Sequence, residues 1–154
     1  MANPTFAPVT GVPVVSSVEW SSGLLHGGGD CGLWCTTCWC PCITFGRVAE
    51  IVDRGSTSCS TSAALYGLLC HLGGFQWIYS SMYRGKLRAQ YGITGGPCGD
   101  CCVHFFCERC ALRQEYRELV ARGYDPMLGW DLNVQRAAAA AATTAPAMHQ
   151  QMMR

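Results

Sequence analysis

The stretch that decides the fold is "AALYGLLCHLGGFQWIYSSMY", residues 63–83, because it is long enough and apolar enough to cross a membrane. It lies inside a run from residue 55 to residue 83 that contains no Asp, Glu, Lys or Arg and is bounded by Arg54 and Arg84. As a single helix it would extend about 31 Å, which matches the hydrocarbon core of a bilayer. The stretch therefore predicts a membrane-spanning helix.

The residues within and after this stretch bear on that interpretation. Aromatic side chains typical of a membrane interface stand near its end: Trp77, Tyr79 and Tyr83. Basic residues follow at once and favour a cytosolic end: Arg84, Lys86 and Arg88. The alternative is a helix buried in a protein core, which Gly73-Gly74 and the polar His71 and Gln76 make less favourable.

A second candidate span lies upstream in "CGLWCTTCWCPCITFG", residues 31–46, which holds sixteen residues without a charge. As a helix it would extend about 24 Å, short of a bilayer core of roughly 30 Å. Continuing to residue 52 takes in Arg47 and Glu50, and Pro41 should kink or break the helix. We expect a marginal or re-entrant segment, and overall a mainly α, small integral membrane protein: a helical hairpin of about two membrane segments plus a Cys-rich cytosolic amphipathic helix.

That amphipathic helix is expected in "ERCALRQEYRELVARG", residues 108–123. Its apolar residues recur at i, i+4, i+7 and i+8: Leu112, Tyr116, Leu119 and Val120. The chain then divides into an irregular Pro-, Gly- and Ser-rich arm (1–30), a Cys-rich membrane domain (31–125) and a low-complexity, disordered tail (126–154) with a helical stub at the alanines.

Composition excludes several classes of function. A formal net charge of +1, with no basic run interleaved with aromatic residues, gives no reason to expect a nucleic-acid partner. Charged residues make up 14% of the chain and hydrophobic residues 49%, which is apolar for a small domain and favours a membrane. His71 and His104 could each partner a cysteine, but no catalytic motif or phosphate-binding loop is present. We therefore do not expect an enzyme.

Twelve cysteines carry the chemistry of this sequence. The first cluster contains Cys31, Cys35, Cys38, Cys40 and Cys42, and the second contains Cys98, Cys101, Cys102, Cys107 and Cys110. Three pairs have Cys-x2-Cys spacing, but the last two pairs are separated by five residues, too few for a zinc ribbon. The first twenty residues have no basic region and no compact apolar region, so we expect no cleavable signal peptide.

Four roles for these cysteines stay open. In a reducing compartment, clustered thiols are typical ligands of soft metals such as zinc or cadmium. Cysteines beside a membrane are also common sites of acylation, and a free cysteine packs well as a small hydrophobic residue. Disulfides require that part of the chain face an oxidising environment.

Three segments resemble a known family: "CTTCWCPCITFGRVAEIVDRG" (35–55), "YSSMYRGKLRAQYGI" (79–93) and "CCVHFFCERCALRQEYREL" (101–119). They are similar to the plant cadmium resistance and cell-number-regulator group, the plant branch of the Cys-rich placenta-specific-gene-eight family. The resemblance covers residues 30–125. The family's CC- or CL-x4-CPC motif is met by Cys35, Cys40, Pro41 and Cys42, with Trp34 where the first cysteine often stands. Its Q-x-x-R motif is met by Gln114 and Arg117, and Arg113 replaces a cysteine of many members.

The resemblance implies a small plasma-membrane protein linked to zinc and cadmium efflux or tolerance and, in other members, to organ size. The expected metal contacts are Cys35, Cys38, Cys40, Cys42, Cys101, Cys102, Cys107 and Cys110. A two-helix hairpin cannot enclose a pore, so transport would require a homo-oligomer with weak, multiple ion sites. Glu50 and Asp53 would help to form the ion path, although a solvated cap paired with Arg47 and Arg54 explains them equally well.

Three hypotheses for the function compete. The first is metal efflux by a homo-oligomer in contact with membrane lipid, with zinc as a transported or bound ion. The second is a membrane-anchored regulator of cell number that acts as a scaffold and docks a partner through Leu112, Tyr116 and Leu119. The third is a soluble zinc module, which predicts tightly bound, stoichiometric zinc.

Overall fold

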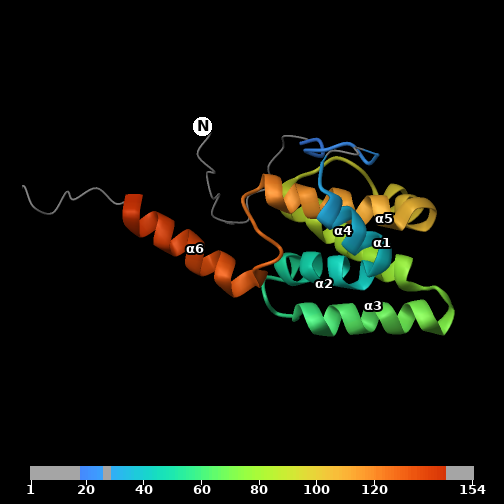
Figure 1. Ribbon diagram of the computed structural model, residues 1–154. Helices are drawn as coiled ribbons and strands as arrows, with labels where there is room; N and C mark the ends of the chain where they lie inside the picture. The colour runs from blue at the N-terminus through green and yellow to red at the C-terminus, as the bar shows by residue number, and fades with distance from the viewer. Residues whose placement is uncertain (1–17, 26–28, 145–154) are drawn as a thin grey trace, which may run out of the picture.

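The computed structural model describes residues 18–25 and 29–144, and within these ranges the chain is mainly α-helical (Figure 1). The helices are α1 (Cys31–Trp39), α2 (Pro41–Val52), α3 (Cys59–Gly73), α4 (Gln76–Tyr91), α5 (Pro97–Ala121) and α6 (Gly129–Thr144). Most of the expected N-terminal arm and the end of the expected tail lie outside the described ranges. The part of the tail that is described is largely helical, because α6 contains the alanine run.

The predicted membrane-spanning helix over residues 63–83 is wrong, because Gly73 and Gly74 divide the stretch between two helices. Gly73 has φ 148° and Gly74 has φ 74°, a conformation that residues with a side chain rarely adopt. The amides of Gly74 and Phe75 donate to carbonyls of α3 and close its C-terminal end, and α4 begins at Gln76. Within the described ranges, no helix has both the length and the apolar character needed to cross a membrane. The integral membrane hairpin is therefore not supported.

The upstream segment is also divided, at Cys40. This residue has φ −134° and ψ 66°, and its amide donates to the Thr36 carbonyl at the end of α1 over 2.8 Å. Pro41 then takes the first position of α2, where the missing N–H costs little because first-turn amides have no acceptor within the helix. Pro41 breaks the helix as expected. The marginal or re-entrant membrane segment is nevertheless wrong, since α2 lies at the centre of a helical bundle.

Helix α2 lies between α3 on one side and α1, α4 and α5 on the other (Figure 1). Seven of its twelve residues are buried, which makes it the core helix of the bundle. Its Phe45 is fully buried against the rings of Tyr66, Tyr79 and Tyr83, with centroid distances of 5.1, 5.0 and 5.2 Å. Aromatic pairs at such distances contribute about 0.5–1.5 kcal/mol each beyond simple burial. The aromatic cluster therefore joins α2, α3 and α4.

Helix α5 has the amphipathic pattern that the sequence predicts, but its apolar face is part of the core. Leu112 and Leu119 are fully buried, and Tyr116 is almost so. Val120, the last member of the stripe, is half-exposed. The expected docking of a partner through the first three residues is therefore wrong, because this face already packs within the bundle.

A buried polar network joins α4 to α5. The Nη2 atom of Arg84 donates to Oε1 of Gln114 over 2.7 Å, and its Nη1 atom lies 3.3 Å from Oε1 of Glu115. His104 lies between Ser80 and Glu115, within 2.9 Å and 2.8 Å of their side-chain oxygens. Because buried charges are costly unless paired, this network holds the two helices in one register.

Candidate functional site

The free cysteines of this protein are exposed or partly exposed. All twelve lie in the described part of the chain, and ten of them are free thiols. The exposed thiols are Cys31, Cys35, Cys40, Cys70, Cys98 and Cys102, and the partly exposed ones are Cys38, Cys42, Cys59 and Cys101. Free cysteine is normally one of the most buried residue types. Packing in the core is therefore not the role of the six exposed thiols, whose sulfur atoms can meet a solute or a lipid, whereas Cys42 packs against the core.

The first cluster follows α1 onto the start of α2. Cys31 and Cys35 line a cavity of about 390 Å³, together with Asp30, Trp34 and Arg113. The Asp30 carboxylate also caps α1 by accepting from the Leu33 amide. Cys38, Cys40 and Cys42 lie at the far end of α1 and at the junction with α2. The cluster is thus spread along one helix and its junction.

The second cluster divides into two parts, and the first part is in the opening turns of α5. The Cys98 and Cys102 side chains are hydrogen-bonded to each other, and Cys98, with a smaller effect of burial and of Cys101, raises the pKa of the Cys102 thiol. The Cys101 sulfur lies 3.6 Å from Oγ of Ser81 on α4. Cys98 and Cys102 therefore form an exposed dithiol, in which one thiolate disfavours ionisation of the other.

The second part is a disulfide between Cys107 and Cys110, whose Cα atoms are 5.4 Å apart. Cys107 also has non-helical φ −145° and ψ 63°, so α5 is kinked at this residue. In this oxidised state neither sulfur is a thiolate, and neither can serve as the metal ligand that the sequence predicts. Among the residues that the structure describes, no three His, Cys, Asp or Glu side chains are grouped so that they could hold a metal ion.

The two predicted ion-path carboxylates have protein partners. Glu50 accepts from the amides of Cys59 and Trp130, at 3.0 and 2.9 Å. Asp53 accepts from the Tyr83 hydroxyl at 2.6 Å and pairs with Lys86 at 2.9 Å. Burial alone would raise the pKa of Asp53, but the hydrogen bonds from Tyr83 and Lys86 hold it below its ordinary value. These contacts give both carboxylates a structural role, in tying α2 to α3, α4 and α6.

The family-motif residues Gln114 and Arg117 lie on α5 beside the N-terminal segment. Gln114 donates from Nε2 to the Ser22 carbonyl over 2.7 Å while it accepts from Arg84. Burial lowers the pKa of the Arg117 guanidinium, and the neighbouring Arg113 lowers it further. Gln114 therefore holds the segment before α1 against α4 and α5, a role that the sequence alone does not predict.

Sequence reasoning missed one candidate residue, Cys70. It stands alone in the sequence, outside both clusters, but in the fold it lines a cavity of about 310 Å³ together with Tyr66, Gln76, Cys107 and Glu108. The signal available in the sequence was its position four residues after Tyr66, on the same face of a helix. Only the fold brings it next to α5.

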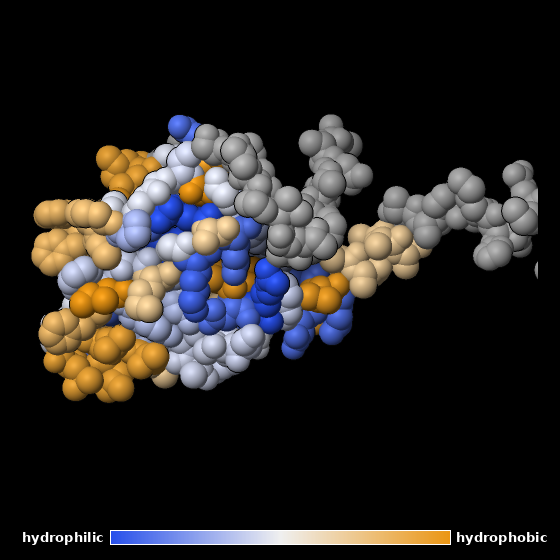
Figure 2. All heavy atoms as spheres, turned by 180° about the vertical axis from the view of Figure 1, so that it is seen from behind, coloured by the Kyte–Doolittle hydropathy of each residue, from blue (hydrophilic) through white to orange (hydrophobic). Residues whose placement is uncertain are grey.

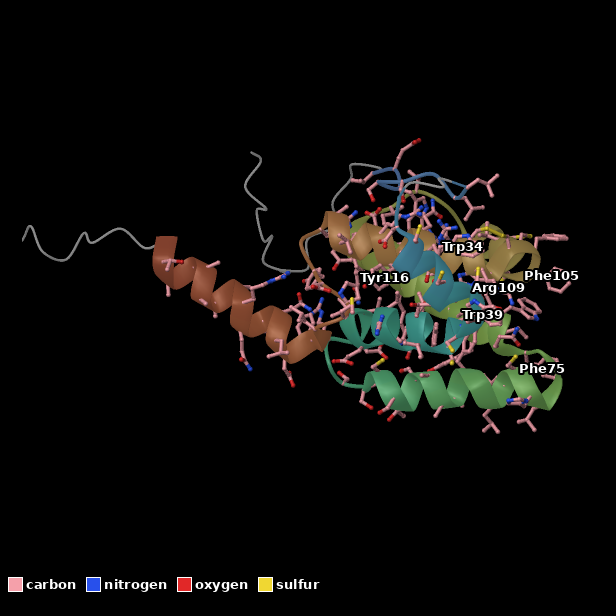
Figure 3. The ribbon with its side chains drawn as sticks, in the orientation of Figure 1. Trp34, Trp39, Phe75, Phe105, Arg109 and Tyr116 are labelled. Atoms are coloured by element: carbon pink, nitrogen blue, oxygen red, sulfur yellow. A yellow bond between two sulfur atoms is a disulfide. The ribbon has the colours of Figure 1, made fainter. Side chains whose placement is uncertain are left out.

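One end of the bundle has an apolar surface, which we call the apolar end. Its large exposed side chains are Trp39, Leu68, Leu72, Phe75, Phe105 and Phe106. Figure 3 shows three of them, Trp39, Phe75 and Phe105, at the same end as Arg109, and Figure 2 shows apolar residues gathered at this end of the molecule. Helix α3 contains no Asp, Glu, Lys or Arg, and only Ser62 and Tyr66 of its fifteen residues are buried. Exposed apolar surface of this kind marks an interaction site.

Comparison with known proteins gives consistent matches. Residues 20–118 match the PLAC8 family. The chain is 65% identical to Cell number regulator 10 of Zea mays over 130 residues, which cover 82% of this chain and 83% of that relative. It is 60% identical to Protein Plant Cadmium Resistance 2 of Arabidopsis thaliana over 118 residues, covering 77% and 78% of the two chains. No solved structure matches. The family resemblance seen in the sequence is confirmed.

Proposed function

Because the chain belongs to the plant branch of the PLAC8 family, we propose that it binds divalent heavy-metal ions, zinc and cadmium, at the plasma membrane and promotes their efflux. The observation that carries the proposal is the accessibility of its thiols: ten free cysteines, none of them buried. Thiolates are soft ligands that select zinc, cadmium or copper(I) over magnesium or calcium. A relative that is 60% identical is named for cadmium resistance, and this supports the same chemistry here.

The arrangement of the thiols favours exchange of metal over permanent storage. A closed four-thiolate site binds zinc with a free energy of about 10–16 kcal/mol and therefore holds its ion tightly. Here the free thiols are spread over α1, α2, α3 and α5, singly and as the Cys98–Cys102 dithiol. Sites with one or two thiolates bind more weakly, and a protein that passes an ion onward needs sites that release it.

We assign the membrane contact to the apolar end, lying in the plane of the lipid surface. Burying a Leu or Phe side chain in lipid contributes about 1.5–3 kcal/mol to the free energy of membrane binding, so several such residues suffice to attach the protein to the membrane. Trp39 and the Phe residues suit the interface between headgroups and acyl chains. The exposed guanidinium of Arg109 on α5 belongs to the same end and complements anionic headgroups. Exposed Cys40 would be available there for acylation.

Cadmium tolerance of sensitive cells tests the proposal. Expression of the protein should raise the cadmium concentration that the cells survive and lower their cadmium content, because efflux removes the ion whereas sequestration retains it. A variant with exposed cysteines 31, 35, 40, 98 and 102 replaced by serine should lose both effects. As a control, replacing exposed serines 56 and 60 by alanine should leave them unchanged. Equal tolerance with and without the wild-type protein would refute the proposal.

A second function, regulation of cell number, is favoured by the 65% identity to Cell number regulator 10. The scaffold that this requires must use a surface other than Leu112, Tyr116 and Leu119, which are in the core. A cysteine-free variant that still controls cell number in a growing organ would favour the scaffold over metal binding. That the protein acts as a homo-oligomer stays a prediction. The molecular mass of the lipid-bound protein tests it, because a homo-oligomer has a multiple of the mass of one chain.

A further inference from the structure

The cavity of about 310 Å³ lies where α3, the start of α4 and the kinked part of α5 meet, beside the apolar end. Its lining includes two sulfur-bearing residues and one carboxylate: Cys70, Cys107 and Glu108. Phe106, one of the most exposed apolar side chains, also lines it. The cavity therefore joins groups from parts of the sequence that are more than thirty residues apart.

The carboxylate in this cavity has only uncharged partners. Glu108 accepts from Ser80 Oγ at 2.9 Å and from Gln76 Nε2 at 3.1 Å, and it is also hydrogen-bonded to Tyr66. Arg109 lines the same cavity but is exposed, and in the described part of the chain Glu108 forms no ion pair. A half-buried carboxylate without a counter-ion is electrostatically suited to a cation.

Further acceptor groups surround the same space. The Oε1 atom of Gln76 is buried without a hydrogen-bond partner, although its amide nitrogen donates to Glu108. Burial raises the pKa of Tyr66 above its ordinary range, and Glu108, Cys70 and Cys42 add to the effect in that order. The thiols of Cys70 and Cys42 and the Glu108 carboxylate are thus close enough to the Tyr66 hydroxyl to raise its pKa. Sulfur together with oxygen is the ligand set of zinc or cadmium.

We propose that this cavity is a binding site for a divalent soft-metal ion, held by Cys70, Cys107 and Glu108, and that the Cys107–Cys110 disulfide controls it. The proposal rests on the proposed function and names the ligands of one site. While the disulfide is intact, the Cys107 sulfur is bonded to Cys110 and the ligand set is incomplete. In this oxidised state no three His, Cys, Asp or Glu side chains of the described residues are grouped to hold a metal ion, so the proposal requires that the site form on reduction.

The controlling step is reduction by a thiol or dithiol reductant. The reductant supplies two electrons and two protons, the bond between the two sulfurs breaks, and Cys107 and Cys110 become thiols while the reductant becomes a disulfide. Binding of a divalent ion then displaces the thiol protons of Cys70 and Cys107 to solvent.

The test measures binding of Cd²⁺ alone to the purified full chain, oxidised or reduced by a phosphine, through the ultraviolet absorbance of cadmium–thiolate bonds. Reduction should strengthen cadmium binding to the wild type. In the reduced protein, Cys70→Ser and Glu108→Gln should each weaken it by at least about tenfold, the lower end of what losing even a supporting group costs. Asp131→Asn, which removes an exposed carboxylate on α6 that does not line this cavity, is the matched control for Glu108→Gln and should leave cadmium binding unchanged.

Cys110→Ser tests the control by the disulfide separately. This variant leaves the Cys107 thiol free in both states, so cadmium binding should no longer depend on the reductant. Undiminished binding by Cys70→Ser, equal losses in Glu108→Gln and Asp131→Asn, or equal binding by the oxidised and reduced wild type would each overturn the proposal. If cadmium binds at the site as expected but the protein gives cells no cadmium tolerance, the proposed function is refuted and the site is not. If the protein gives tolerance but the variants bind cadmium as the wild type does, only the site is refuted.

Discussion

The Nε2 atom of His104 lies 2.8 Å from Oε1 of Glu115, and neither side chain is exposed to solvent. The same oxygen receives Nη1 of Arg84 at 3.3 Å. On its other side, His104 contacts Ser80, whose hydroxyl donates to Glu108 at the wall of the 310 Å³ cavity. The buried network between α4 and α5 is therefore continuous with the proposed metal site.

Replacing Glu115 by alanine should destabilise the protein by about 3–5 kcal/mol, because Arg84 would remain buried with its charge only partly compensated. Unfolding by urea, followed by far-ultraviolet circular dichroism, measures the free energy of unfolding. The control is Asp131→Asn on the exposed start of α6, which should change that free energy by no more than about 1 kcal/mol. Similar stabilities for Glu115→Ala and the wild type would show that the network does not hold the helices together.

Two glycines give a matched pair for the packing of α2 against α3. A Cβ atom added at Gly46 would lie 2.5 Å from the Cys59 carbonyl oxygen, a backbone atom that cannot easily move. Gly46→Ala should therefore cost about 1–3 kcal/mol of the free energy of unfolding. Gly67→Ala on α3 meets nothing within 4 Å and should stabilise the helix by about 0.5–1 kcal/mol. Urea midpoints of the two variants check both signs, and a stable Gly46→Ala variant would contradict the close approach.

The helices themselves follow from local sequence signals. Pro41 at the first position of α2 and the stripe of Leu112, Tyr116 and Leu119 on α5 both act as expected. The prediction of a membrane hairpin was wrong because matching the length of an apolar stretch to the bilayer treats residues 63–83 as one helix. Gly73 and Gly74 were visible in the sequence, but whether a glycine pair bends or ends a helix depends on the contacts that each half finds.

The candidate site was less predictable than the helices, since ligand sets are made by tertiary contacts. The two cysteine clusters defined in the sequence contain residues that are neighbours in the chain, such as Cys35 and Cys38. The cavity instead joins Cys70 to Cys107 and Glu108, which are 37 and 38 residues further along. No periodicity links these positions. The exposed face of α3 likewise has the composition of a membrane-spanning helix, so composition alone does not distinguish a surface helix from a span.

The apolar end should bind lipid vesicles, and Phe106→Glu should weaken that binding. Because a buried Phe contributes about 1.5–3 kcal/mol, its loss should lower vesicle affinity by about tenfold or more. Co-sedimentation with vesicles of anionic and zwitterionic lipid measures this affinity, and the anionic vesicles should bind better. The control is Leu132→Glu, an exposed apolar residue on α6 away from this end, which should leave the affinity unchanged. Equal binding by both variants would locate the lipid contact elsewhere.

The contact between Asp53 and its partners on α4 gives a dependence of stability on pH. Burial opposes ionisation of Asp53, but the hydrogen bonds from Tyr83 and Lys86 dominate, so its pKa in the folded state is below the ordinary value of 3.8. A group whose pKa is lowered on folding stabilises the fold above its unfolded pKa, and that stability is lost as the pH falls through the folded pKa.

The wild type should therefore exceed Asp53→Asn in free energy of unfolding at neutral pH, and the difference should shrink below about pH 4. Urea unfolding at a series of pH values checks this. A control variant, Asp131→Asn, removes an exposed carboxylate at the start of α6 and should differ from the wild type by nearly the same amount at every pH. A constant difference for Asp53→Asn as well would show that the Tyr83 and Lys86 contacts do not favour the ionised carboxylate.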